Sequence, residues 1–512
     1  MTMAVFRYVR DGRAHSLSFV PPARIPDLLR QAGLAFDFPC GGRGACLKCR
    51  ARLTGAVSPM DAREESLLSG AEHAGGVRFL CMATALGDCE AVVDPAGDEA
   101  VETGAPERFS PQPWGRTLGA AFDLGTTTIA GALYSLETGR RLATAGMRNP
   151  QRAFGADVMS RLDAAEAGRG DALAQAARSG LRGVLDALCA RAGVSQADVD
   201  SAVVAGNTAM LYLLTGRPVS SIARAPFEQD EHFGALMDPR LAGLPEGMQV
   251  FLPYCLSAYI GADTAAALLA ARFIGPEGLT EGPPRLLADI GTNGEIALSA
   301  GGRLLCCSAA AGPAFEGAGI SQGMPARDGA VWRVALRDGV PQAQVLGGGH
   351  ALGLCGSGLL ETAAALLETG VLDESGRLRD GAYTLPGTHV TLTQADVRAL
   401  QLAKAAIRAA TEVLLAEANT RACDVAELAV AGGFGGGLRS RPTQAVGLFP
   451  PELTSRMRAL GNGALAGAAM ALLSRPFRDA VARRPAQART VSLATHPLFM
   501  DAYVDAMRFG RA

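Results

Sequence analysis

Four cysteines near the start of the chain have the type and spacing of ligands for a metal centre. Cys40, Cys46 and Cys49 lie in the run Pro-Cys-Gly-Gly-Arg-Gly-Ala-Cys-Leu-Lys-Cys, and 31 residues separate Cys49 from Cys81. Cysteine thiolates bind iron and zinc. The three glycines of the run allow the backbone to wrap around such a centre and to direct N–H groups at its sulfur atoms. The pattern therefore predicts a metal centre held by these four side chains.

Two kinds of centre use four thiolates, a 2Fe–2S cluster and a structural zinc site. Plant-type ferredoxins hold a 2Fe–2S cluster with three thiolates from one loop and a fourth from a distant strand, although their first gap is four residues and not five. Zinc ribbons usually present two Cys-x-x-Cys pairs, and here seven residues separate Cys81 from Cys89. We therefore expect iron–sulfur, with zinc as the alternative, and Cys89 as a buried residue outside the ligand set.

The six remaining cysteines are scattered, although Cys306 and Cys307 are adjacent and Cys355 lies in a glycine-rich turn. A second cluster that bridges two subunits is one interpretation of them. Cysteine is among the most frequently buried residue types, so we expect these side chains to lie in the core without binding metal.

Two short motifs that could bind phosphate follow apolar segments that predict strands. Asp-Leu-Gly-Thr-Thr-Thr spans residues 123–128, and Asp-Ile-Gly-Thr-Asn-Gly-Glu spans residues 289–295. The glycine allows a sharp turn whose N–H groups and hydroxyls suit phosphate oxygens, and an acidic residue at the strand end can hold Mg²⁺ through water. Each motif alone also occurs as an ordinary strand turn, but the ordered pair favours a clamp around a triphosphate. The candidates are Gly125, Thr126, Thr127, Gly291, Thr292 and Asn293 for phosphate, with Asp123 and Asp289 for Mg²⁺ and the attacking water.

A third motif, Ala-Val-Ala-Gly-Gly-Phe-Gly-Gly, spans residues 429–436. An apolar strand that runs into glycines can bring backbone flat against a nucleoside, which makes Gly432, Gly433 and Phe434 candidates for that contact. Alone the motif is also typical of a strand-to-helix turn, but with two phosphate loops it favours an ATP site. The chain has no Gly-x-x-x-x-Gly-Lys-Ser/Thr run, so a P-loop is not the mechanism.

Two further acidic residues, Asp263 and Glu316, lie beside glycine turns. Either carboxylate could polarise water or bind metal. Either could equally provide a negative charge at a helix N-terminus or form the turn itself. The sequence leaves both interpretations open.

The elements that must position these residues divide the chain into an α+β unit over 1–95, a linker over 96–116 and a larger α/β domain over 117–512. The linker is rich in Gly, Pro and Glu without apolar periodicity. The α/β domain contains two strand–turn–strand units of one kind, which suggests a duplicated fold with lobes near 117–284 and 285–512. The predicted strands are 4–9, 15–20, 50–53, 77–80, 89–93, 118–124, 129–135, 286–290 and 295–300, and the predicted helices are 25–32, 61–69, 171–192, 262–273, 359–367 and 393–418.

Composition excludes several classes of function. The 512 residues include 48 % hydrophobic and 19 % charged residues, and the net charge is −2. This balance predicts neither a general nucleic-acid binder nor a polybasic membrane anchor. The longest apolar stretches, such as 265–271, are too short to span a bilayer, and the first ten residues lack the apolar core of a secretory signal. We therefore expect a cytoplasmic protein.

The cysteine run followed by the three nucleotide motifs resembles the reductive activators of corrinoid proteins. The likeness covers nearly the whole chain and implies a β-grasp, ferredoxin-like domain fused to a duplicated actin/hexokinase-like ATPase domain of the ASKHA type. Larger members carry an additional middle domain, for which the linker leaves no room here. Further matching stretches are 149–151, 154–158, 206–210, 226–227, 261–264, 312–317, 355–358, 396–398, 401–407 and 461–464.

The resemblance implies an enzyme that hydrolyses ATP and uses a 2Fe–2S cluster to reduce a corrinoid cofactor from Co(II) to Co(I). It also implies a corrinoid protein of a methyltransferase system as partner, a low-potential electron donor and a homodimer. A small-molecule kinase with a redox-sensing ferredoxin domain is the alternative, and an electron carrier with a degenerate ATP site is a third.

Overall fold

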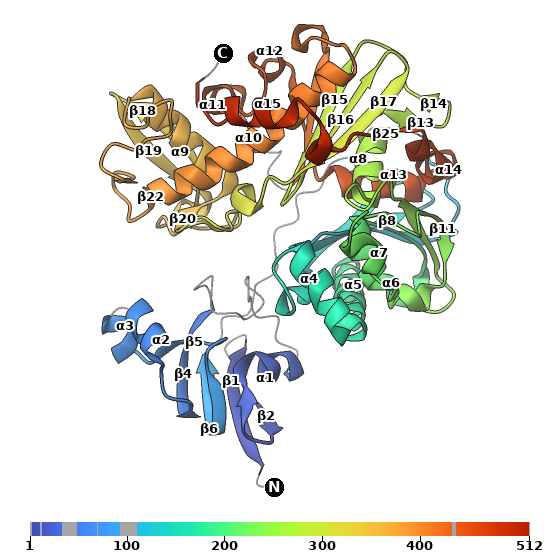
Figure 1. Ribbon diagram of the computed structural model, residues 1–512. Helices are drawn as coiled ribbons and strands as arrows, with labels where there is room; N and C mark the ends of the chain where they lie inside the picture. Colours follow the sequence, from blue (N-terminus) through green and yellow to red (C-terminus); the bar gives the residue numbers. More distant parts are fainter. Residues whose placement is uncertain are drawn as a thin grey trace.

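The computed structural model describes residues 3–10, 13–32, 49–68, 70–92, 110–432 and 437–510. It contains an N-terminal mixed sheet and two larger α/β lobes (Figure 1). Among these residues no helix combines the length and the apolar composition needed to cross a membrane.

The N-terminal unit is a sheet with the strand order β2-β1-β6-β4-β5, to which β3 adds by pairing with β6. β1 is antiparallel to β2 and parallel to β6, and Leu28 and Leu29 of α1 share a buried core with Phe6. The strands expected over 4–9 and 15–20 pair with one another, and the first helix is confirmed. The helix expected over 61–69 ends at Leu67 because Leu68 is extended, and a separate short helix begins at Gly70. The elements are β1 (Ala4–Arg10), β2 (Arg13–Phe19), β3 (Ala23–Arg24), α1 (Ile25–Gln31), β4 (Arg50–Val57), α2 (Ala62–Leu67), α3 (Gly70–Ala74), β5 (Val77–Phe79) and β6 (Thr84–Val92).

The first lobe is built on a sheet with the strand order β11-β12-β10-β7-β8-β9. β7, β8 and β9 form an antiparallel meander, whereas β10 runs parallel to β7 and β12 runs parallel to β10. β7 and β10 are apolar without alternation, as expected of strands covered on both faces. The elements are β7 (Leu118–Leu124), β8 (Thr128–Ser135), β9 (Arg141–Arg148), α4 (Val158–Ala164), α5 (Gly170–Ala192), β10 (Val199–Gly206), α6 (Thr208–Thr215), α7 (Ser220–Ala223), β11 (Phe233–Met237), β12 (Gln249–Tyr254), α8 (Ala262–Ala270), β13 (Ile274–Gly275) and β14 (Gly278–Leu279).

The second lobe repeats the same strand pairing, which confirms the predicted duplication. β15, β16 and β17 form the meander, β23 runs parallel to β15, and β24 runs parallel to β23. A subdomain with its own sheet is inserted between β17 and α10. The elements are β15 (Arg285–Ile290), β16 (Gly294–Ala300), β17 (Arg303–Ala309), β18 (Ala330–Arg337), β19 (Val340–Val345), β20 (Gly353–Leu354), α9 (Gly356–Glu368), β21 (Ala382–Thr384), β22 (Thr391–Thr393), α10 (Gln394–Glu417), β23 (Glu427–Ala431), α11 (Ser440–Val446), α12 (Pro451–Thr454), β24 (Met457–Gly461), α13 (Gly463–Leu473), α14 (Arg475–Arg483), β25 (Arg489–Thr490) and α15 (Phe499–Asp505).

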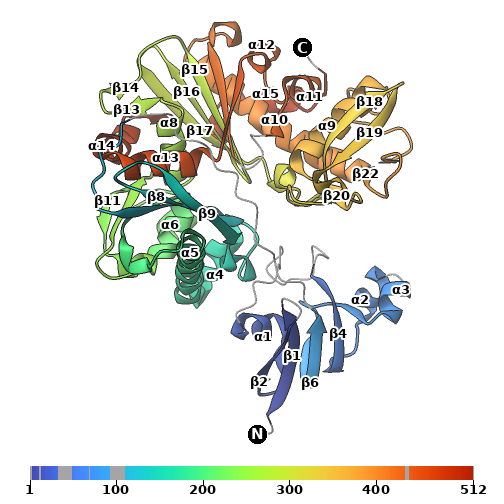
Figure 2. The same cartoon turned by 180° about the vertical axis from the view of Figure 1, so that it is seen from behind.

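Helices α8 and α13 form a layer between the two sheets, and their side chains share one core with residues from both (Figures 1 and 2). Helix α5 covers the opposite face of the first sheet, and α10 covers that of the second. The alanines and glycines of α8 and α13 allow a close crossing, because a Cβ on Gly467 would lie 1.8 Å from the carbonyl oxygen of Ala266. The two lobes therefore meet along a pair of small-residue helices.

The last residues assigned to the linker, 110–116, lie against the ATPase lobes. The indole N–H of Trp114 donates to the Ala471 carbonyl at 2.9 Å, and the Trp114 ring is buried. The N–H groups of Arg116 and Thr117 donate to one carboxylate oxygen of Asp200, each at 2.8 Å. The glycine and proline content of this segment predicted a linker. Trp114 nevertheless anchors the segment, because burial of its large apolar ring stabilises the folded state.

Candidate functional site

A cavity of about 700 Å³ lies between the two lobes, and all three predicted nucleotide motifs contribute to its walls. The N-terminal ends of α8 and α13 close it through Asp263 and Asn462. Gly433 and Phe434 lie outside the described residues. The predicted residues that the structure brings together around the cavity are Asp123, Gly125, Thr126, Thr127, Asp289, Gly291, Thr292, Asn293 and Gly432.

The first phosphate loop is the tight turn between β7 and β8. The Gly125 N–H donates to the Thr128 carbonyl at 3.0 Å, and a Cβ on Gly125 would lie 2.6 Å from that oxygen, so the turn requires glycine. The Asn149 amide donates to the Gly125 carbonyl at 2.8 Å, and the Asn207 amide donates to the Thr126 hydroxyl at 3.1 Å. Two asparagines that lie outside the loop sequence therefore hold the loop in place through hydrogen bonds.

The second loop, between β15 and β16, is closed one residue earlier than the first. The Gly291 N–H donates to the Asn293 carbonyl at 2.9 Å. A single oxygen of Glu316, Oε2, accepts hydrogen bonds from Thr292 Oγ1 at 3.1 Å and from Thr127 Oγ1 of the first loop at 3.0 Å. The two loops thus face one another, as a clamp around phosphates requires.

Four partly buried carboxylates lie near the loops, and the pKa of each is raised. Burial raises the pKa of Asp123 to about 7, with the Asn462 hydrogen bond acting against the shift and Asp263 adding to it. Burial, then repulsion from Asp263 and Asp123, raises the pKa of Asp289 to about 8. Burial also raises the pKa of Asp263 to about 6 and that of Glu295 well above its usual range. Removal of these carboxylates from water, together with their mutual repulsion, therefore favours their protonated forms.

The nucleoside motif forms another wall of the cavity. The Gly432 N–H donates to the Gly461 carbonyl at 3.0 Å, and Gly432 has a φ of 99°. A Cβ there would lie 2.3 Å from the Ile290 carbonyl oxygen, so only glycine fits beside the second phosphate loop. Met324 and Trp332 of the inserted subdomain also line the cavity and provide apolar surface that suits a base.

In the N-terminal unit, Cys49 and Cys81 are buried with their sulfur atoms 3.2 Å apart. The Leu80 N–H donates to the Cys49 carbonyl at 2.9 Å, which holds the two strands of the site together. Cys40 and Cys46 lie outside the described residues. Cys89 is buried, as expected, and burial raises the pKa of its thiol to about 11.

Three of the four cysteines of the second lobe follow the prediction that they are core residues, whereas Cys423 is exposed and the prediction is wrong for it. Cys306, Cys307 and Cys355 are all buried, and burial raises the pKa of Cys306 to about 12. Within the ranges that the structure describes, no group of three or more His, Cys, Asp or Glu side chains converges closely enough to hold a metal directly.

Sequence reasoning gave no role to Asn207, Asn462 or Glu295. Asn207 and Asn462 each follow a strand and cap the next helix, and each turns its amide toward a phosphate-loop residue. The Asn462 amide donates to Asp123 at 2.8 Å. An asparagine between an apolar strand and an apolar helix was the available signal, because it predicts an N-cap at the end of a strand.

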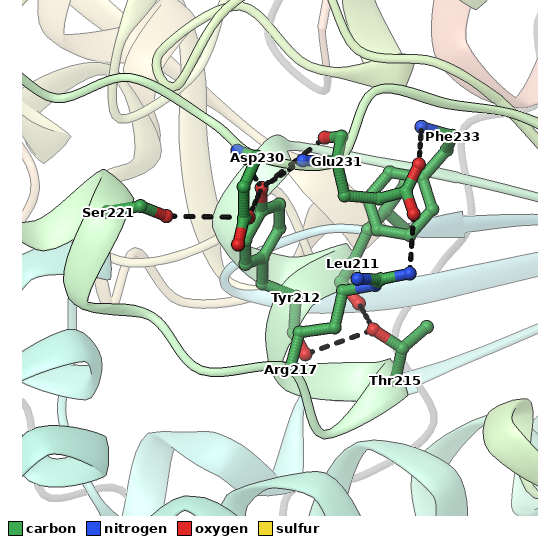
Figure 3. A network of polar contacts seen from close by, with 8 residues as sticks. All are labelled: Leu211, Tyr212, Thr215, Arg217, Ser221, Asp230, Glu231 and Phe233. Atoms are coloured by element: carbon green, nitrogen blue, oxygen red, sulfur yellow. Dashed lines mark hydrogen bonds and ion pairs between the residues drawn. The ribbon is translucent and has the colours of Figure 1, made fainter.

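Helix α6 starts at the cleft and is fixed further along by a polar network (Figure 3). The Tyr212 hydroxyl donates to the Asp230 carboxylate at 2.6 Å and accepts the N–H groups of Asp230 and Glu231 at 2.9 and 2.8 Å. The Glu231 carboxylate in turn forms an ion pair with Arg217. The network holds α6, and with it Asn207, in a set position beside the first phosphate loop.

Two family models match the chain. One, described as the C-terminal domain of RACo, the ASKHA domain, matches residues 284–512, and one described as the RACo middle region matches residues 118–274. The expectation that the chain leaves no room for a middle domain is therefore wrong, because the matched region is the first lobe. That expectation placed the middle domain between the linker and the first phosphate loop, whereas the matched region includes this loop.

Individual relatives agree with this assignment. The corrinoid activation enzyme RamQ of Eubacterium limosum is 32 % identical over 424 residues, which cover 77 % of this chain and 70 % of the relative. The Co(II) methylated amine-specific corrinoid protein reductase of Methanosarcina barkeri is 28 % identical over 422 residues, 75 % of this chain and 76 % of the relative. A solved structure of a reductive activator for a corrinoid, iron-sulfur protein has the same fold, with a TM-score of 0.72 over 99 % of this chain and 98 % of that chain at 24 % identity.

These names do not favour the kinase alternative, and the duplicated lobes match the ASKHA type of ATPase. The chain belongs to the family of reductive activators of corrinoid proteins.

Proposed function

We propose that this protein uses ATP to drive the one-electron reduction of a corrinoid protein from Co(II) to Co(I). The observation that carries the proposal is a two-lobed nucleotide cleft in the same chain as a buried cysteine pair spaced for an iron–sulfur centre. Both curated relatives are named for activating or reducing corrinoid proteins. An ATP-driven electron transfer gives both sites a purpose, whereas phosphorylation of a metabolite leaves the cysteines without one.

In this proposal, Mg-ATP binds with its phosphates between the two phosphate loops. Mg²⁺ fits the carboxylate cluster, because burial, and after it the repulsion between the carboxylates, raises the pKa values of Asp123 and Asp289, and a nearby cation would favour their ionised forms. Magnesium usually keeps several waters, which agrees with carboxylates that do not converge on one point. Asp123 and Asp289 orient these waters and the attacking water, while Gly432, Gly433 and Phe434 line the nucleoside.

We assign Cys40, Cys46, Cys49 and Cys81 as the ligands of a 2Fe–2S cluster. The paired sulfurs of Cys49 and Cys81 fit such a centre, because two strands bring them together in a buried setting. When bound, the cluster supplies the single electron that Co(II) takes up. The chain's own residues bind the cluster and exclude water from it.

ATP is needed because Co(I) is a stronger reductant than the donor. For one electron, about 59 mV corresponds to a tenfold change in the equilibrium constant. A switch with a differential affinity of roughly 5.5 kcal/mol therefore offsets roughly 0.24 V. Closure of the lobes around Mg-ATP provides such a switch by changing how tightly the partner's Co(II) and Co(I) states are held.

The proposal also includes a low-potential electron donor, a homodimer and a cytoplasmic location. The donor would pass its electron to the cluster. Light scattering tests the dimer, for which a mass of twice 52.7 kDa is expected.

Turnover of ATP separates this function from that of a kinase. A Co(II) corrinoid protein of a methyltransferase system should stimulate ATP hydrolysis, and a panel of sugars and small acids should not. Stimulation by a small metabolite, with formation of its phosphate ester, would establish the kinase alternative instead.

A further inference from the structure

Glu316 connects the two phosphate loops across the cleft. Its Oε2 atom accepts the hydroxyl of Thr127, in the first lobe, at 3.0 Å and the hydroxyl of Thr292, in the second lobe, at 3.1 Å. One carboxylate oxygen therefore joins residues that are 165 positions apart in the sequence and belong to the two halves of the duplication.

The backbone fixes the position of this carboxylate. Glu316 ends a short 3-10 helix, Pro313–Glu316, in which Phe315 is buried. Gly317 follows with a φ of 74°, and a Cβ there would lie 2.5 Å from the Met324 carbonyl oxygen. The buried Phe315 before Glu316 and the tightly packed Gly317 after it therefore fix the backbone that places Glu316 at the cleft.

The same two hydroxyls are the ones expected to meet the phosphates of ATP. A threonine hydroxyl carries one proton, so it cannot donate to Glu316 and to a phosphate oxygen at once. The carboxylate also repels phosphate, because both are negative. Glu316 and the nucleotide consequently compete for Thr127 and Thr292.

We propose that Glu316 is a positioning residue that latches the two phosphate loops together in the nucleotide-free protein and is displaced by the phosphates of ATP. This inference rests on the proposed nucleotide site and adds its regulation. When ATP binds, its phosphates replace the Glu316 carboxylate as the group that connects Thr127 and Thr292. The exchange makes the connection between the lobes depend on whether ATP is present.

Calorimetric titration of E316Q tests the latch. The probes are Mg²⁺ with the non-hydrolysable β,γ-imido analogue of ATP, and adenosine, which has no phosphates. Glutamine keeps the shape but is a weaker acceptor, so the dissociation constant of the analogue should fall by about fivefold or more, while that of adenosine stays unchanged. The matched control is E281Q, which removes a charge from an exposed glutamate outside the cleft and should leave both constants unchanged.

A second background separates the latch from simple charge repulsion. In T127V/T292V the hydroxyls for which Glu316 competes are gone, so adding E316Q should tighten binding of the analogue by a clearly smaller factor than in the wild-type background, because only the relief of charge repulsion remains. Equal tightening in both backgrounds, or unchanged or weaker binding in E316Q alone, would overturn the latch. If the wild-type protein did not bind the analogue at all, the proposed nucleotide site would fail, and the latch with it.

Discussion

At the scale of single residues, the partly buried carboxylates of the cleft make the protein respond to pH. Asp123 and Asp289 ionise near about 4 in an unfolded chain, whereas their pKa values are raised to about 7 and about 8 in the folded protein. Between these limits the folded state binds more protons than the unfolded state. The free energy of unfolding therefore decreases as pH rises from about 4 to about 8, as far as these two groups determine it.

We predict that the melting temperature of the metal-free and nucleotide-free protein falls between pH 6 and pH 8.5, and that Mg²⁺ restores it more at pH 8.5 than at pH 6. Mg²⁺ needs the ionised carboxylates, so its binding strengthens as the protons leave. The variant D289N should show a smaller fall and a smaller Mg²⁺ effect, because it removes the group with the pKa of about 8. Thermal melts across this pH range provide the test, and a pH-independent response to Mg²⁺ would contradict it.

The cysteines offer a matched pair of variants. Cys81 contacts Cys49 at 3.2 Å, whereas Cys89, equally buried, lies in β6 outside the predicted ligand set. C81A should lose the visible absorbance and most of the iron after anaerobic reconstitution, and C89A should keep both. Loss of the cluster in C89A but not in C81A would show that the ligand set is wrong.

At the scale of elements, the crossing of α8 and α13 holds the lobes together. A Cβ on Gly467 would lie 1.8 Å from the Ala266 carbonyl oxygen, so G467A must push the helices apart. We expect the free energy of unfolding to fall by about 1–3 kcal/mol. The control is G170A in α5, where an added Cβ would meet nothing within 4 Å. Urea melts compare the two, and an equal effect of both substitutions would contradict the close crossing.

The sequence predicted elements well wherever one pattern dominated. Strand 118–124 was placed without error, and the duplication followed from the two Asp-x-Gly-Thr turns. Helix α9 begins at Gly356, earlier than the predicted residue 359. Glycines usually argue against a helix, but Gly358 allows the helix to pack closely against β18, since a Cβ there would lie 1.9 Å from the Val331 carbonyl oxygen. Helix α8 ends at Ala270, short of the predicted residue 273, and Arg272 adopts a φ of 60°.

The site could be predicted only in part, for a physical reason. Glycines and threonines that form a phosphate loop carry a local signal, so both loops were found. Asn207 and Glu316 act on residues that are 81 and 189 positions away. Their roles depend on which lobes face each other, which no local pattern encodes.

At the scale of the whole molecule, two sites with different chemistry must act on one partner. In the proposed function, Mg-ATP changes the relation between the lobes, and the cysteine centre delivers an electron whose transfer to Co(II) is uphill. The account requires that these events are coupled: without closure of the cleft the electron stays on the protein. Nucleotide dependence of the cobalt oxidation state is therefore its central claim.

The most direct test mixes the reduced, cluster-loaded protein anaerobically with a Co(II) corrinoid protein and follows the cobalt absorbance. We predict that Co(I) forms when Mg-ATP is added and not in its absence, and that D289N forms none under either condition. Equal Co(I) without nucleotide, or no Co(I) with Mg-ATP while the cluster is loaded and reduced, would contradict the account.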